Sequence, residues 1–148
     1  MLRGFPDLPP IWLLATMTLS WLLGRLPLPG AGTVGQWGGA LLIALGLLLI
    51  AWAALHFWLK RTPIEPHHRP KALIVEGPYR LSRNPIYLAL VVIALGFALR
   101  QDAITGLLPV PALWWVLDRR FAAVEEALLR DEFGAEATAY LARTRRWL

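Results

Sequence analysis

The feature that most constrains the fold is a long apolar segment without a charged side chain. Residues 38–59 form a run of 22 positions that contains no Asp, Glu, Lys or Arg. As an α-helix at about 1.5 Å per residue, this run is roughly 33 Å long, which is enough to cross a bilayer core about 30 Å thick. Only 17% of the 148 residues are charged, against roughly a quarter in a soluble domain. The sequence therefore predicts an integral membrane protein.

Three further apolar blocks, residues 8–24, 86–99 and 103–117, are also free of charged side chains. Apolar residues continue at helical spacing after the last block, so we expect one helix over 103–133 that ends at Gly134. The last two blocks are short for a bilayer, and they form either two spans joined by a tight turn or a hairpin that crosses only in part. The helical continuation favours two spans.

The predicted fold class is thus an all-α integral membrane protein with about four transmembrane helices, the last two a hairpin, and a cytoplasmic helical extension. We expect a single domain over residues 1–148. Its predicted segments are helices at 8–24, 38–59, 86–99 and 103–133, a connector at 25–37, a loop at 60–85 and a C-terminal segment at 134–148.

The distribution of basic residues predicts the orientation. Thirteen of the 15 Lys and Arg residues lie in the N-terminal segment, the loop at 60–85 or the C-terminal region, and only Arg25 and Arg100 lie in the opposite loops. Because basic loops stay on the cytoplasmic side, both termini are expected to face the cytoplasm. Topology thus accounts for the net charge of +5, and we do not expect nucleic-acid binding.

The residue types of the spans limit the function classes. His56 is the one ionisable side chain within the four apolar blocks, which argues against an ion-coupled transporter or channel. The absence of Cys excludes disulfides and thiolate metal sites. His67 and His68 are adjacent but lack the further ligands that a zinc site needs, so no metal is expected. Polar residues gather in two cytoplasmic segments, 60–84 and 118–148.

The first polar segment holds proline and glycine turns. Gly77-Pro78 turns the chain, and Asn84-Pro85 ends the loop with Pro at the favoured first position of a helix. Between and after these turns lie Tyr79, Arg80, Arg83 and Tyr87. The two Tyr rings are suited to flank a flat ring, and the two Arg side chains either bind an anionic ligand or anchor the loop to lipid headgroups.

The second polar segment carries Glu125 and Glu126 on the helical extension. Glu125 lies four residues from both Phe121 and Leu129, so it borders the apolar stripe, and Glu126 is one residue further round the helix. The pair is either part of a site at the membrane face or a solvated helix surface.

Taken together, these residues resemble a known enzyme family. The run Leu73…Gly77-Pro78-Tyr79-Arg80…Arg83-Asn84-Pro85-Ile86-Tyr87, an apolar hairpin, and Glu125-Glu126-x-x-Leu129-x-x-x-Phe133-Gly134…Tyr140 follow one another in the chain. Their order and spacing resemble the isoprenylcysteine carboxyl methyltransferase family, which includes bacterial membrane relatives and is similar to the phospholipid N-methyltransferases. The resemblance covers residues 60–148.

The resemblance implies S-adenosylmethionine as the cofactor, a lipophilic methyl acceptor, and a bacterial inner membrane as the location. It implies a catalytic role for Glu125, with Arg119 and Arg120 as the basic candidates, because Phe121 stands where the family carries Arg. The alternative is a non-catalytic membrane scaffold or assembly protein that keeps the fold. The cofactor-binding residues that the family resemblance implies are Leu73, Gly77, Tyr79, Arg80, Arg83, Asn84, Pro85, Tyr87, Glu125 and Glu126.

Overall fold

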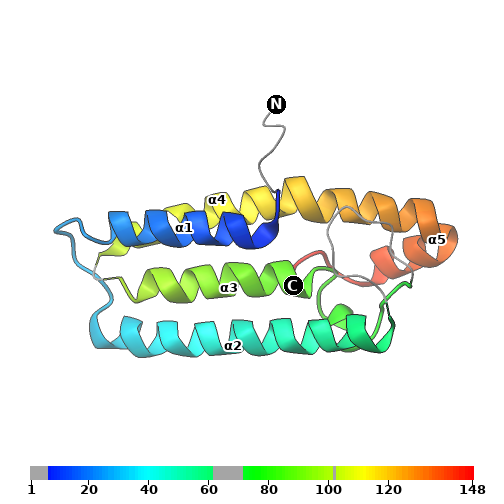
Figure 1. Ribbon diagram of the computed structural model, residues 1–148, viewed down its shortest axis with the longest axis horizontal. Coiled ribbons are helices and arrows are strands. Elements are labelled where there is room, and N and C mark those ends of the chain that lie inside the picture. Colours follow the sequence, from blue (N-terminus) through cyan, green and yellow to red (C-terminus); the bar gives the residue numbers. More distant parts are fainter. Residues whose placement is uncertain (1–6, 62–71, 102) are drawn as a thin grey trace.

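The computed structural model describes residues 7–61, 72–101 and 103–148, and every regular element in these ranges is helical. The all-α part of the prediction is therefore confirmed. Helices α1, α2, α3 and α4 lie side by side along one axis, and α5 continues past the end of this bundle (Figure 1). The elements are α1 (Pro9–Leu23), α2 (Gly32–Leu59), the 3-10 turn η1 (Gly77–Arg80), α3 (Pro85–Leu99), the 3-10 turn η2 (Ile104–Leu107), α4 (Pro109–Val116), the π-helical turn η3 (Leu117–Ala122) and α5 (Ala123–Arg143).

The apolar helices differ in length. Within the described ranges, α2 alone is both long and apolar enough to cross a membrane, whereas α1 and α3 are apolar but have 15 residues each. Large apolar side chains such as Leu41, Leu48 and Trp37 on α2 are exposed. Exposed large apolar side chains are unfavourable in water, and several on one helix mark an interaction surface. The structure thus supports membrane association.

Helix α2 begins at Gly32, six residues before the predicted start, so the expected connector at 25–37 is shorter than predicted. The reason is close packing against α3. A Cβ added to Gly35 would lie 2.6 Å from the carbonyl oxygen of Leu99, and one on Gly96 would lie 2.6 Å from that of Gly39. Small residues let two apolar helices approach closely, and this packing offsets the weak helix propensity of glycine.

The predicted helix over 103–133 is divided. The chain forms the 3-10 turn η2, begins α4 at Pro109, and widens into the π-helical turn η3 before α5. Gly134 has φ 51° and ψ −118°, so it interrupts the helix geometry as expected, but helical structure resumes and reaches Arg143. One helical stretch therefore ends at Gly134, as predicted, and a second one follows it to Arg143.

The two predicted outer loops lie at the same end of the bundle. The Ile104 amide donates to the carbonyl of Pro29 at 3.0 Å, and the Thr105 hydroxyl donates to that of Leu23 at 2.7 Å. The loop before α3 and the whole of α5 lie toward the other end (Figure 1). This arrangement places the two polar segments together.

The α2–α3 contact gives a stability prediction. A methyl group at Gly39 would strike the carbonyl oxygen of Gly96, whereas one at Gly38 meets nothing within 4 Å. Gly39→Ala should therefore destabilise the protein by about 1–3 kcal/mol through overpacking. Gly38→Ala, the matched control on the next residue, should be neutral or slightly stabilising because Ala favours helix. Thermal unfolding in detergent, followed by tryptophan fluorescence, measures both; equal midpoints would contradict the packing.

Candidate functional site

The two polar segments meet at the end of the bundle opposite to the outer loops. Arg83, from the loop before α3, donates from Nη1 to Oε1 of Glu126 at 2.9 Å. Tyr87, in the first turn of α3, donates from its hydroxyl to Glu125. The Asn84-Pro85 step ends the loop and begins α3, so the start of this helix is fixed against α5. The segments that the sequence singled out are thus in contact.

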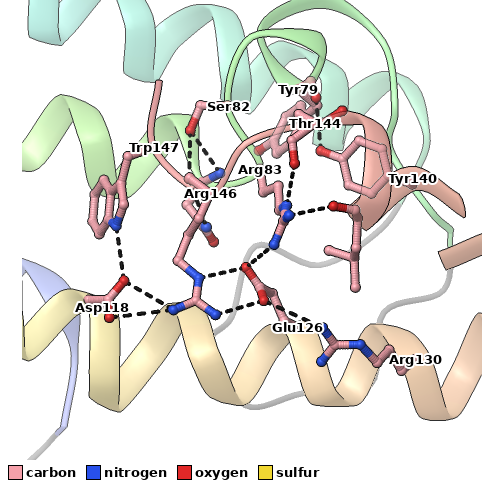
Figure 2. A network of polar contacts seen from close by, with 12 residues as sticks. Tyr79, Ser82, Arg83, Asp118, Glu126, Arg130, Tyr140, Thr144, Arg146 and Trp147 are labelled. Atoms are coloured by element: carbon pink, nitrogen blue, oxygen red, sulfur yellow. Dashed lines mark hydrogen bonds and ion pairs between the residues drawn. The ribbon is translucent and has the colours of Figure 1, made fainter. Parts of the chain in front are cut away.

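A buried carboxylate is the centre of the site (Figure 2). Glu126 is 2% exposed and accepts hydrogen bonds from Arg146, whose Nε and Nη2 each lie 2.8 Å from one of its oxygens. Nη2 of Arg130, one turn along α5, is 3.8 Å away. Nη1 of Arg146 also lies 3.2 Å from Asp118, which accepts the indole N–H of Trp147 at 2.9 Å. Two acidic side chains are therefore joined through one guanidinium.

The ionisation of this cluster follows from its hydrogen bonds. Burial alone would raise the pKa of Glu126, but the hydrogen bonds from Arg146 and Arg83 outweigh it and hold the pKa below its ordinary value. The same hydrogen bond to Glu126 raises the pKa of Arg146 despite its partial burial. Glu126 is thus a carboxylate and Arg146 a cation at neutral pH.

The residues after α5 close over the loop, and we call residues 144–147 the C-terminal strap. Arg83 donates from its guanidinium to the carbonyls of Leu141 and Thr144, and its backbone amide donates to the carbonyl of Arg145 at 2.9 Å. The hydroxyl of Ser82 donates to the carbonyl of Arg146 at 3.0 Å. The strap is therefore fastened to the loop through its backbone and to α5 through a side chain.

Three tyrosines lie beside this network. Tyr79 is buried, and burial together with the negative charge of Glu125 raises its pKa, so its hydroxyl keeps its proton. Tyr140 donates to the carbonyl of Tyr79 at 2.8 Å, and burial raises the pKa of Tyr140 to about 12. Tyr87 packs against Phe121 with the ring centres 5.9 Å apart. Tyr79 and Tyr87, the two Tyr residues singled out in the sequence, thus both lie near Glu125.

A pocket of about 460 Å³ opens between η1 and the start of the strap. Gly77 has φ 58°, and a Cβ there would strike the imidazole ring of His56, so glycine is required at this turn. The two guanidinium groups at the pocket, from Arg80 and Arg143, give it the chemistry to hold a carboxylate or a phosphate. The lining residues are Val75, Glu76, Gly77, Arg80, Arg143 and Thr144.

The predicted site residues fall into three groups. Gly77 and Arg80 line the pocket, while Arg83, Asn84, Pro85, Tyr87, Glu125 and Glu126 lie at the junction of the loop with α3 and α5. Leu73 packs against the buried cluster around Tyr79 and Tyr140. His67 and His68, like the rest of residues 62–71 in the predicted loop at 60–85, lie outside the described residues.

Arg119 and Arg120 are the basic residues that the sequence analysis placed beside Glu125, and the structure pairs them with Asp118 and Asp7. Both are mostly exposed on η3; Nε of Arg119 lies 3.6 Å from Asp118, and Nε of Arg120 lies 2.7 Å from Asp7. The guanidinium groups on Glu126 belong instead to Arg83, Arg130 and Arg146.

Sequence reasoning missed Asp118, Arg146 and Trp147. In the sequence, Arg146 is one of several basic residues near the C-terminal end, and its charge is accounted for by topology. The available signal was that Asp118 and Glu126 lie eight residues apart at the membrane end of one helix, so two acidic groups in an apolar setting require a cationic partner.

Comparison with known proteins gives one family. A family model described as phospholipid methyltransferase matches residues 34–136, more than two thirds of the chain. No curated protein and no solved structure matches significantly.

The lowered pKa of Glu126 predicts how stability depends on pH. Its contribution should be complete above the ordinary pKa of 4.5 and lost as the pH falls through the lowered folded value. Glu126→Gln should cost about 3 kcal/mol at neutral pH, because it breaks a buried ion pair, and should flatten the acid limb. Unfolding midpoints between pH 3 and 8 measure this. Glu136→Gln, on the exposed face of α5, should leave the profile unchanged; an identical profile for both variants would contradict the role of Glu126.

Proposed function

The chain belongs to the phospholipid methyltransferase family, and from this premise we propose that it transfers a methyl group from S-adenosylmethionine to a lipophilic or small hydrophobic acceptor at the cytoplasmic membrane face. The family includes proteins like the isoprenylcysteine carboxyl methyltransferases, so the resemblance drawn from the sequence is confirmed. The observation that carries the proposal is the meeting of the Gly77–Tyr87 segment with Glu125 and Glu126 beside a pocket.

The residues present fit the methyl donor. The pocket volume of about 460 Å³ is within the range of small-molecule sites, roughly 300–1,000 Å³. Arg80 and Arg143 suit a carboxylate, and Glu76 suits an amino group or a hydroxyl. S-adenosylmethionine, when bound, supplies a methyl group on a positively charged sulfonium.

In this proposal the residues of the chain orient the reactants and exclude water. Tyr87 holds one side of Glu125 by a hydrogen bond, which fixes the carboxylate at the start of α3. Glu125 is half-buried and is suited to accept a proton from an amine or thiol acceptor, or to hold a hydroxyl of the donor. A carboxylate acceptor would instead be held by the pocket arginines.

A membrane location suits a lipophilic acceptor. The exposed apolar side chains of α2 are suited to lipid contact, and we propose that the acceptor enters sideways from the bilayer. The distribution of basic residues supports both termini in the cytoplasm, and the resemblance to the family suggests a bacterial inner membrane as the location.

The second candidate is a non-catalytic membrane scaffold or assembly protein. It is favoured by Phe121, which stands where the resemblance implies an arginine. Phe121 is fully buried against Tyr87, so an apolar contact replaces a charge beside Glu125. A scaffold would keep the fold and lose ligand binding, which separates the two candidates by experiment.

The enzyme proposal predicts ligand-dependent stability. S-adenosylmethionine and S-adenosylhomocysteine should raise the unfolding midpoint of the purified protein, because binding adds about 2.7 kcal/mol to the free energy of unfolding at a hundredfold excess over Kd. Glu125→Gln and Tyr79→Ala should abolish this shift, whereas Glu136→Gln should keep it. Transfer of labelled methyl into a lipid extract tests the reaction itself. A wild-type protein without any shift at millimolar ligand would favour the scaffold.

A further inference from the structure

Arg146, in the C-terminal strap, makes more side-chain hydrogen bonds to acidic residues than packing of the strap alone requires. Its guanidinium lies between Asp118 on η3 and Glu126 on α5, with three of its nitrogens engaged (Figure 2). The contacts to Glu126 are both 2.8 Å, and the contact to Asp118 is 3.2 Å. This forked geometry is specific to arginine, because an ammonium is a single point charge without a fixed plane.

The two carboxylates depend on this guanidinium. Asp118 otherwise has the indole N–H of Trp147 and the mostly exposed Arg119. Glu126 otherwise has Arg83 and, at 3.8 Å, Arg130. Within the described ranges, Arg146 is the side chain that pairs with both acids. Without it, two buried acidic groups eight residues apart on one continuous helical stretch would lose the cation that they share.

The strap that carries Arg146 also forms part of the pocket wall. Thr144 lines the pocket, and its carbonyl is held by the guanidinium of Arg83. The carbonyl of Arg146 accepts the hydroxyl of Ser82 and, at 3.3 Å, the amide of Asn84. The loop, the strap and α5 therefore form one junction. Arg146 contacts the loop through its carbonyl and α5 through its guanidinium.

We propose that Arg146 is a positioning residue of the methyl-transfer site. Its guanidinium fixes the loop against α5, which sets Tyr87 against Glu125 and holds Thr144 at the pocket wall. Arg146 does not itself line the pocket, so it acts through these residues and not on the reactants. This inference rests on the proposed function, because it assigns the junction a role in ligand binding beyond stability.

The test compares full-length Arg146→Gln, Arg146→Lys and Arg61→Gln in lipid nanodiscs. Arg61 is exposed after the end of α2 and serves as the control for the loss of one positive charge. Calorimetry gives Kd for S-adenosylhomocysteine, and methyl-transfer assays give KM and kcat. We expect Kd and KM to rise at least tenfold in Arg146→Gln and less in Arg146→Lys, which restores charge without the fork. Arg61→Gln should stay within twofold of wild type.

A second variant separates positioning from folding. In Glu126→Gln/Arg146→Gln the buried carboxylate is removed together with its guanidinium partner, so the unfolding midpoint should recover part of its loss while Kd stays raised. A purely structural role would restore Kd together with the midpoint, and that result would overturn the inference. The double variant also replaces Arg146→Gln if the single variant fails to fold.

Two outcomes distinguish this inference from the proposed function. If wild type and Arg146→Gln bind S-adenosylhomocysteine equally, the positioning role is wrong and the proposed function stands. If the wild type does not bind S-adenosylhomocysteine, both are wrong.

Discussion

The end of this protein that carries the two polar segments depends on the pairing of one buried carboxylate. Transferring a charge out of water costs several kcal/mol unless it is paired and hydrogen-bonded. Glu126 meets this requirement through Arg83 and Arg146, which lie 43 positions before it and 20 positions after it. A partly formed junction would leave a charged group unpaired in an apolar setting. The loop, α5 and the C-terminal strap are therefore stable together and unstable apart.

The two ends of the molecule are held together by different forces. Toward the outer loops, α2 and α3 approach through glycines, and the contact is one of close packing between backbones. At the other end, charged and hydrogen-bonded groups take over, and the apolar residues Tyr79, Tyr87 and Phe121 lie between the two regions. Under the proposed function, a water-soluble methyl donor and a lipophilic acceptor would meet at this end of the molecule.

Much of the helical framework could be predicted from the sequence. Helices α1 and α3 begin and end within one residue of the predicted bounds, because a proline begins each helix and a charged or glycine-rich segment follows it. The start of α2 could not be predicted, since glycine has weak helix propensity and the close contact of Gly35 with Leu99 of α3 is visible only in the structure. The meeting of the loop with the Glu pair was expected from the family resemblance.

The sequence could not show which acid is buried or what pairs with it. Regular helical spacing places Glu125 at the border of the apolar stripe, yet Glu126 is the more buried of the two. The π-helical turn η3 precedes both residues, and a wide turn breaks the regular spacing on which that prediction depends. Arg146 could not be identified because nothing local distinguishes it from the neighbouring arginines; its partners are fixed only by the three-dimensional arrangement.

The π-helical turn also has a consequence for how the long rod from α4 through α5 is divided. In a regular helix each residue advances the side-chain direction by about 100°, so the angular phase of one part determines that of the next. A single wide turn at η3 uncouples the two phases. The α4 part can thus keep its buried side chains toward α1 and α3, while the α5 part turns Glu126 inward. A sequence change that alters the direction of the side chains in one part of the rod therefore requires no matching change in the other part.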